Sequence, residues 1–332
     1  MGIVSITNNF GKPKYKQIVS SIEEAITNGA LKRGDKLPSL NSIKSQHSLS
    51  RDTVLTAFNE LKARGVIQSV VGKGYYVTTE DLAINQKVFL LFDEFNSFKE
   101  DLYNSFLAQL GDNVQVDIFF HHFNNGVFNK LINDNLGDYN YYIIMPANLS
   151  HTEGTIGKLP KDKVYILDQT HQELSKYPSI YQNFKKDIYE GLLEGISLIR
   201  RYQKVILLFS NEKQPNGILE GFQLFCSHHG LKHEIIYDVK DVEISKGELY
   251  MILDDRNLIR IIKKTKERRF VIAKDIGIIS FNDTLLKEVV EDGITTISTD
   301  FKLMGKHLAL MVTGNKFEQV ENPSRLILRN SL

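Results

Sequence analysis

Residues 50–77 read SRDTVLTAFNELKARGVIQSVVGKGYYV, and their apolar spacing changes from helical to extended near Gly65. Ser50 is a favourable N-cap, and the apolar side chains from Val54 to Leu61 recur at the spacing of one helical face. Gly65 ends this helix. Two short apolar runs then flank Gly72-Lys73-Gly74, which is the pattern of a β-hairpin with a glycine-rich tip.

Two more helices precede this segment. Apolar positions from Tyr15 to Ile26 predict a helix over residues 13–29, and Pro13 suits its first turn. Ser39 is a good N-cap for a short second helix. Three helices followed by a hairpin predict an α+β winged helix-turn-helix head, which we place at residues 1–78.

The start of the third helix carries polar side chains that face away from its apolar stripe. Ser50, Arg51 and Thr53 are able to reach base edges and phosphates in a major groove. The free N–H groups of the helix N-terminus also attract phosphate oxygens. Lys73 lies between two glycines, so the hairpin tip could approach a minor groove closely.

The charge of the head agrees with this interpretation. Residues 1–80 hold 11 Lys and Arg against 6 Asp and Glu, whereas the whole chain is nearly balanced at 41 against 40. A basic excess on one small domain suits phosphate contact. Three helices and a hairpin also occur in protein-binding domains, but the motif order and the charge together favour DNA.

The head resembles the GntR family of bacterial winged-helix regulators over about residues 8–78. The resemblance rests on the runs Gly34 to Ser39, Ser50 to Val54, Leu61 to Ile67 and Gly72 to Val77. It implies DNA contacts at the start of the third helix and at the wing. With the start of the second helix included, the candidate DNA-binding residues are Ser39, Asn41, Ser50, Arg51, Asp52, Thr53, Gly72, Lys73 and Gly74.

The chain departs from that family at two places. It has Leu40-Asn41 where the family usually has Glu-Arg, and Leu55 where an Arg is frequent. Two expected arginine contacts are therefore absent, and the operator sequences of better-known relatives do not transfer to this chain.

Length and composition indicate a second, larger domain. The 332 residues suit two domains, and residues 79–86 are a polar segment that we predict to be the linker. Cys226 is the one cysteine, which fits a reducing compartment. We find no secretory signal and no apolar run of about 18 residues, so we expect a cytoplasmic protein without a membrane span.

Residues 87–332 alternate between strand and helix patterns, which predicts parallel sheets covered by helices on both faces. The predicted strands are Val88–Phe92, Val114–Phe120, Tyr141–Met145, Val164–Leu167, Val205–Phe209, His233–Tyr237, Leu249–Leu253 and Ile276–Phe281, and the predicted helices are 98–110, 187–201, 217–229 and one through 261–262. Such sheets bind ligands at the carboxyl ends of their strands. About 245 residues are many for one sheet, so we expect two lobes with a cleft.

This second domain resembles the sensor domain of the LacI family, which is similar to periplasmic sugar-binding proteins. The runs that carry the resemblance are Leu167-Asp168, Asp187 to Gly191, Gly221-Phe222, Leu253 to Asp255, Ile276 to Asp283, Ile294 to Ile297, Asp300 to Gly305 and Leu328 to Ser331. A GntR-type head on such a sensor resembles the arabinose-responsive repressors of some bacteria.

The LacI-family resemblance implies sugar contacts at Asp168, Asp254, Asn282 and Phe301. Carboxylates and amides bond to sugar hydroxyls, and an aromatic ring covers the apolar face of a pyranose. Other roles are open for these residues, because a strand-end carboxylate also caps a helix and Phe301 could belong to the core. Ile218 stands where the family often has an Arg. The pocket is therefore either less polar or takes its cation from another residue.

The resulting function hypothesis is a DNA-binding transcription regulator, a repressor by its resemblance. Its partners would be a double-stranded DNA operator, a small-molecule effector such as a sugar or sugar phosphate, and a second copy of the chain on a two-fold axis. The alternative is an enzyme with a DNA-binding head, but no nucleophile-and-base constellation is visible. A transport binding protein is disfavoured by the DNA-binding head and the missing signal peptide. We expect no metal and no cofactor, since the histidines lack metal-ligand spacing and no phosphate loop is complete.

Overall fold

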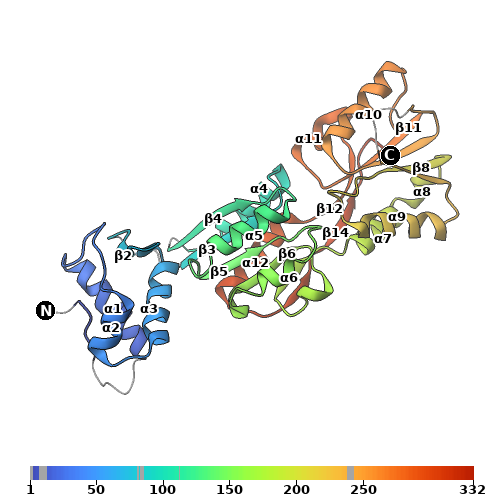
Figure 1. The fold of residues 1–332 in the computed structure, drawn as a ribbon. Coiled ribbons are helices and arrows are strands. Elements are labelled where there is room, and N and C mark those ends of the chain that lie inside the picture. The colour runs from blue at the N-terminus through green and yellow to red at the C-terminus, as the bar shows by residue number, and fades with distance from the viewer. Residues whose placement is uncertain (1–2, 7–12, 81, 83–85, 112, 238–242) are drawn as a thin grey trace. The chain divides into compact units, whose positions relative to one another are not determined.

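The computed structural model describes residues 3–6, 13–80, 82, 86–111, 113–237 and 243–332 (Figure 1). These residues divide into two compact units. Residues 1–92, 110–144 and 151–165 belong to the first unit, and residues 93–109, 145–150 and 166–332 belong to the second. Part of the predicted linker and the start of the region resembling GntR lie outside the described residues.

The first unit begins with the three predicted helices and the hairpin. Their bounds are α1 (Lys14–Thr27), α2 (Leu40–His47), α3 (Arg51–Ala63), β1 (Ile67–Val70) and β2 (Gly74–Val77). Ile18, Ile22 and Phe58 are fully buried between the helices, which confirms the predicted apolar faces. The antiparallel pairing of β1 with β2 sets Ile67 opposite Val77 and leaves Gly72-Lys73 at the tip.

The rest of the described chain forms two six-stranded sheets. The first has the strand order β13-β7-β6-β5-β3-β4 and the second has the order β14-β12-β11-β10-β8-β9. The strands of the first sheet are β3 (Gln86–Phe92), β4 (Val114–Phe120), β5 (Tyr141–Ile144), β6 (Val164–Asp168), β7 (Ser179–Tyr181) and β13 (Gln319–Glu321). Those of the second are β8 (Lys204–Leu208), β9 (His233–Ile236), β10 (Glu248–Ile252), β11 (Ile276–Phe281), β12 (Thr295–Thr299) and β14 (Ser324–Ile327).

Helices connect these strands and cover them. They are α4 (Ser97–Leu107), α5 (Asn125–Asp134), α6 (Thr152–Ile156), α7 (Phe184–Glu194), α8 (Ile196–Ile199), α9 (Asn216–His228), α10 (Asp255–Glu267), α11 (Leu285–Val289) and α12 (Phe301–Thr313), with short 3-10 turns at Lys161–Lys163, Gln172–Leu174 and Val290–Asp292. On one face of the second sheet, Phe222 and Phe225 of α9 pack in the same apolar core as Leu207 of β8. None of the described helices is long and apolar enough to cross a membrane.

The predicted α/β alternation is confirmed, with two differences. The strand pairs whose register is described are parallel as expected, except that β14 runs antiparallel to β12 at the edge of the second sheet. The predicted helix over 187–201 is two helices, because the backbone at Gly195 ends α7 before α8 begins.

Several elements, some of them short, were not predicted from the sequence. They are α5, α6, β7, α11, β12, α12, β13 and β14. Strands of three residues, such as β7 and β13, are too short to show a periodic pattern, and they are recognisable only through their pairing partners.

Candidate DNA interface and ligand cavity

The N-terminus of α3 is exposed and carries polar side chains. Ser50 caps the helix, because its Oγ accepts the backbone N–H of Thr53 at 3.1 Å and lies 2.8 Å from the Thr53 hydroxyl. Arg51 and Asp52 are exposed, whereas Thr53 is half-buried. Val54 of the same helix is fully buried in the head. The first turn of α3 therefore presents its cap and a guanidinium to solvent, as a recognition helix requires.

The hairpin tip is built from glycines in a conformation that other residues rarely adopt. Gly72 has φ +72° and Gly74 has φ +112°. A Cβ at Gly74 would also lie 3.2 Å from Cε of Lys36. Lys73 between them is exposed, and its backbone N–H donates to the carbonyl of Val70 at 2.9 Å, closing the turn. The tip can thus place a cation and bare backbone against a phosphate chain.

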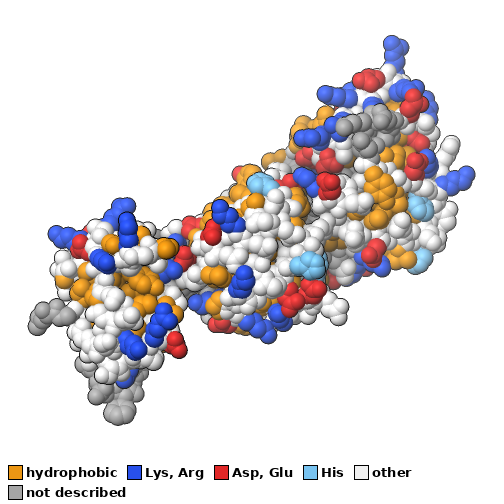
Figure 2. Space-filling model, viewed as in Figure 1, with side chains coloured by type: hydrophobic (Ala, Val, Ile, Leu, Met, Phe, Trp, Pro, Cys, Tyr) orange, Lys and Arg blue, Asp and Glu red, His pale blue; other side chains and the backbone are white. Residues whose placement is uncertain are grey.

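The second helix supplies the remaining predicted DNA residues. Ser39 is exposed and caps α2 by accepting the backbone N–H of Ser42 at 3.1 Å, and Asn41 is exposed in the first turn. Figure 2 shows several Lys and Arg side chains on the visible face of the head, with fewer acidic ones. All nine predicted DNA residues lie on the elements to which the sequence assigned them.

In the second unit, a buried charge cluster surrounds Asp168 at the end of β6. The Asp168 carboxylate accepts a hydrogen bond from Nε2 of Gln182, and its backbone has φ +71°. Lys99 of α4 is only 4% exposed and forms an ion pair with Asp93, which follows β3. Two carboxylates and one ammonium group therefore share a site that water scarcely reaches.

Burial and charge act in opposite directions in this cluster. Burial raises the pKa of the Asp168 carboxyl above its ordinary value, and the positive charge of Lys99 opposes that rise. Burial lowers the pKa of Lys99 to about 8, and the negative charge of Asp168 opposes that fall. Asp168 and Lys99 each favour the charged form of the other, but burial outweighs this attraction for both groups.

Asn282 lies directly after β11 in a strained conformation with φ +58°. It is buried, and its Oδ1 has no hydrogen-bond partner among the described residues. Lys287 holds this turn by donating from Nζ to the carbonyls of Phe281 at 2.8 Å and Asn282 at 2.7 Å. The amide oxygen of Asn282 is thus a fixed, unused acceptor.

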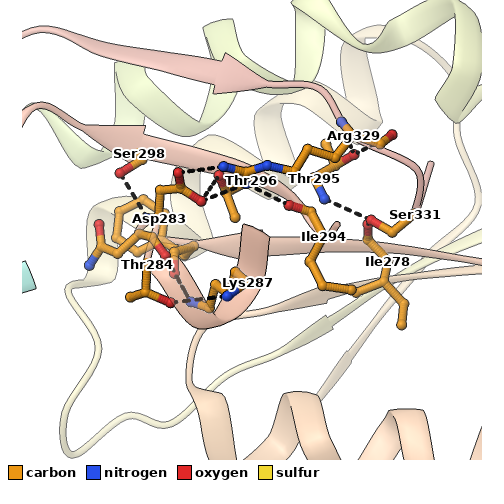
Figure 3. Close-up of polar contacts among 12 residues, drawn as sticks. Ile278, Asp283, Thr284, Lys287, Ile294, Thr295, Thr296, Ser298, Arg329 and Ser331 are labelled. Atoms are coloured by element: carbon orange, nitrogen blue, oxygen red, sulfur yellow. Dashed lines mark hydrogen bonds and ion pairs between the residues drawn. The ribbon is translucent and has the colours of Figure 1, made fainter. Parts of the chain in front are cut away.

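The C-terminal segment holds the same loop from the other side (Figure 3). Arg329 donates to both carboxylate oxygens of Asp283, at 2.7 and 2.8 Å, and the Thr296 hydroxyl donates to the same carboxylate. The Ser331 hydroxyl donates to the carbonyl of Ile278 and accepts the backbone N–H of Thr295. The run Leu328 to Ser331, which carries part of the resemblance to the LacI family, therefore holds β11 to β12. It also positions Asn282, the residue before Asp283.

The other two predicted ligand residues have visible structural roles. Asp254 caps α10, with one carboxylate oxygen accepting the backbone N–H of Asn257 at 2.9 Å and the other accepting its side-chain amide at 2.7 Å. Phe301 is 6% exposed and stacks on Phe98 with ring centroids 4.7 Å apart. The capping and packing roles that were left open at the sequence level are both present.

Two cavities lie within the second unit. The smaller has a volume of about 260 Å³ and is lined by Asn148, Gln169, Thr170, His171, Gln182, Phe184, Pro215, Asn216 and Gly217. The larger, about 580 Å³, is lined by residues that include Phe98, Asp283, Thr299, Phe301 and Pro323. Both lie next to segments that follow the carboxyl ends of strands, where open α/β sheets bind ligands.

The structure brings only part of the predicted ligand set to these cavities. Phe301 lines the larger one, and Asp168 contacts Gln182, which lines the smaller one. Asp254 and Asn282 line neither of the two. Sequence reasoning missed Lys99 and Gln182, since nothing in the local pattern marks a lysine on a helix or a glutamine after a strand as the partner of a distant carboxylate.

Comparisons with known proteins address both parts of the chain. The family described as bacterial regulatory proteins, gntR family, matches residues 14–77. The repressor YtrA of Bacillus subtilis is 30% identical over 100 residues, which are 30% of this chain and 73% of YtrA. The chain belongs to the gntR family.

Other relatives of this gntR-family chain are similar over shorter segments. The mannosyl-D-glycerate transport/metabolism system repressor MngR of Escherichia coli is 39% identical over 85 residues, or 25% of this chain and 35% of MngR. The arabinose metabolism transcriptional repressor of Geobacillus stearothermophilus is 36% identical over 66 residues, or 20% of this chain and 18% of that protein. The chain thus spans about a third of the length of MngR and less than a fifth of the length of the arabinose repressor.

The C-terminal part of this gntR-family chain matches a different description. A periplasmic binding protein-like domain matches residues 198–332. A LacI family transcriptional regulator from Silicibacter pomeroyi has the same fold, with a TM-score of 0.63 at 11% identity over 74% of this chain and 98% of that one. These matches confirm the predicted fold class, a winged helix-turn-helix followed by a LacI-type α/β body.

Proposed function

We propose that this chain is a ligand-controlled transcription regulator, and a repressor as several of its relatives are named. The head, residues 1–78, binds double-stranded DNA. The body, residues 87–332, binds a carbohydrate or carbohydrate phosphate, and residues 79–86 link the two. The protein acts in the cytoplasm as a homodimer and has no catalytic role, in keeping with relatives that are named as regulators and repressors.

The observation that carries this proposal is the exposed first turn of α3 beside a glycine-built wing. Arg51 extends from that turn, and Lys73 lies at the wing tip. A duplex could accept α3 in its major groove and the wing on the flanking backbone. Two copies related by a two-fold axis would bind an inverted repeat.

Control by ligand requires that the effector binds one conformation of the body better than another. A coupling free energy of about 1–3 kcal/mol would change operator affinity roughly 5- to 150-fold. The cavity lined by Gln182, whose Oε1 is buried without a hydrogen-bond partner among the described residues, supports binding of a hydroxylated small molecule in the body.

The test is DNA binding by an Arg51→Ala variant, with duplexes that the wild-type chain selects from a random pool. Arg51 is exposed, so its loss should leave folding intact and weaken binding by about 1–3 kcal/mol, roughly 5- to 150-fold. Arg200→Ala removes an exposed arginine after α8 and is the matched control. Gel-shift affinities that are equal for wild type and Arg51→Ala would contradict the assigned recognition helix.

A further inference from the structure

The N-termini of two helices converge at the smaller cavity. Phe184 begins α7 and Gly217 lies in the first turn of α9, and both line the cavity. A Cβ added at Gly217 would lie 3.0 Å from Cβ of Phe184 and 3.1 Å from the backbone nitrogen of Lys185. The absence of a side chain at Gly217 therefore lets the positive ends of both helix dipoles meet at one place.

The N-terminus of α9 has no acceptor of its own. Pro215 stands at the N-cap and offers no side-chain hydrogen bond, and the first turn contains no acidic residue. The first N–H groups of a helix have no intrahelical acceptor, so those of Asn216 and Gly217 are available to a ligand. Such N–H groups, together with the dipole, favour an anion.

Gln182 independently points to a ligand in the same cavity. It is only 7% exposed, and its Oε1 is buried without a hydrogen-bond partner in the part of the chain that the structure describes. Its Nε2 is occupied by Asp168, which leaves the carbonyl oxygen as the free end of the amide. A buried acceptor without a donor is costly, so a hydroxyl donor from a ligand would relieve it.

The lining of the cavity is compatible with a negative ligand. None of the lining residues is a carboxylate, and the nearby Asp168 shares its buried site with the Lys99 ammonium group, which also pairs with Asp93. Ile218, where relatives of the sensor often carry an arginine, is fully buried in the apolar core and supplies no cation. The positive character of the site therefore comes from backbone N–H groups rather than from a guanidinium.

The size of the cavity limits the ligand. Its volume of about 260 Å³ is below the roughly 300–1,000 Å³ of pockets for drug-sized molecules. A single sugar unit fits that space better than a disaccharide does.

We propose that the effector is a small anionic carbohydrate, either a sugar acid or a sugar phosphate. Its anionic group binds the N–H groups at the start of α9, beside the start of α7, and one of its hydroxyls donates to Oε1 of Gln182. This inference rests on the proposed function and narrows its effector to a chemical class.

The test is calorimetric titration of the full chain, without DNA, against pentoses and hexoses in three forms. Each is offered as the neutral sugar, as its aldonate and as its terminal phosphate ester, and inorganic phosphate is titrated alongside. At least one anionic form should bind about tenfold or more tightly than its neutral parent. The aldonate and phosphate arms distinguish the two sources of the anion.

Asn216→Asp places a carboxylate at the first position of α9. It should preserve or raise the thermal midpoint of the free protein, because acidic residues suit a helix N-terminus. It should also weaken the anionic ligand about tenfold or more through charge repulsion, while changing the neutral parent little. Asn125→Asp makes the same change at the first position of α5, where Asn125 is exposed, and should leave binding unchanged.

The inference is overturned if a neutral sugar binds as tightly as both of its anionic forms, if no member of the panel binds, or if Asn216→Asp keeps the full preference for the anion. A neutral preference would leave the proposed regulator intact. The proposed function would instead be contradicted by gel shifts in which the wild-type chain binds no duplex from the random pool.

Discussion

At the scale of single residues, Gly305 lies where α12 packs closely against the backbone of α4. A Cβ at this position would lie 2.3 Å from the carbonyl oxygen of Leu102 and 2.9 Å from the backbone nitrogen of Phe106. Both neighbours are backbone atoms of a helix, so they cannot move aside as a flexible side chain would. This packing fixes the start of α12, and with it Phe301 at the larger cavity.

We therefore expect Gly305→Ala to destabilise the protein by about 1–3 kcal/mol, because overpacking forces backbone shifts. Gly154→Ala is the control, since nothing lies within 4 Å of a Cβ added there in α6. That change should be neutral or stabilise by about 0.5–1 kcal/mol. Urea unfolding of both variants would measure the difference, and equal midpoints would show that the helices can separate at no cost.

Gln182 and Lys99 illustrate the limit of residue-level prediction. Each is ordinary in its own segment, and each matters because a distant strand end delivers Asp168 beside it. A side chain acquires such a role from its neighbours in space, which the local spacing of apolar residues does not report.

At the scale of elements, caps decide where the helices begin. The Ser50, Ser39 and Asp254 side chains each accept a backbone N–H three residues later, and these bonds set the starts of α3, α2 and α10. The first two were predicted from the sequence. For Asp254 the cap is a structural role beside the predicted contact with ligand, and two substitutions separate these roles.

Asp254→Ala should lower the free energy of unfolding by about 1 kcal/mol, since it removes the cap of α10. Asp254→Asn should retain nearly all the stability, because asparagine caps as well as aspartate does. If Asp254 also binds the effector through its charge, both variants should lose the ligand-induced shift in thermal midpoint. A normal shift in Asp254→Asn would leave capping as the whole role of this carboxylate.

At the scale of the whole molecule, α11 exposes an apolar surface that suits the predicted homodimer. Leu285 is 83% and Val289 is 77% exposed, and Leu286 of the same helix is also exposed. A contiguous group of exposed apolar side chains is typical of an interaction surface.

We expect Leu285→Glu to shift the protein from dimer to monomer, because a carboxylate in an apolar contact loses its hydration. Leu310→Glu is the control, since Leu310 is 54% exposed on α12. Light scattering after size-exclusion chromatography would report the masses. A dimer that persists in Leu285→Glu places the two-fold contact elsewhere, and a wild-type monomer contradicts the homodimer itself.

The amino-acid sequence alone determined the kind of head, the order of its elements and the α/β alternation of the body. Local signals were enough there, because caps, apolar periodicity and glycine turns act within a few residues of each other. It also marked Arg51 and Lys73 as exposed, and both are exposed in the structure.

Only the tertiary structure decided which polar groups share a site. Strand pairing and helix packing brought Asp168 to Lys99 and Gln182, and they set the starts of α7 and α9 at one cavity. These partners are far apart along the chain, and burial makes each unpaired polar atom costly. The site therefore follows from long-range packing, which no local pattern in the sequence encodes.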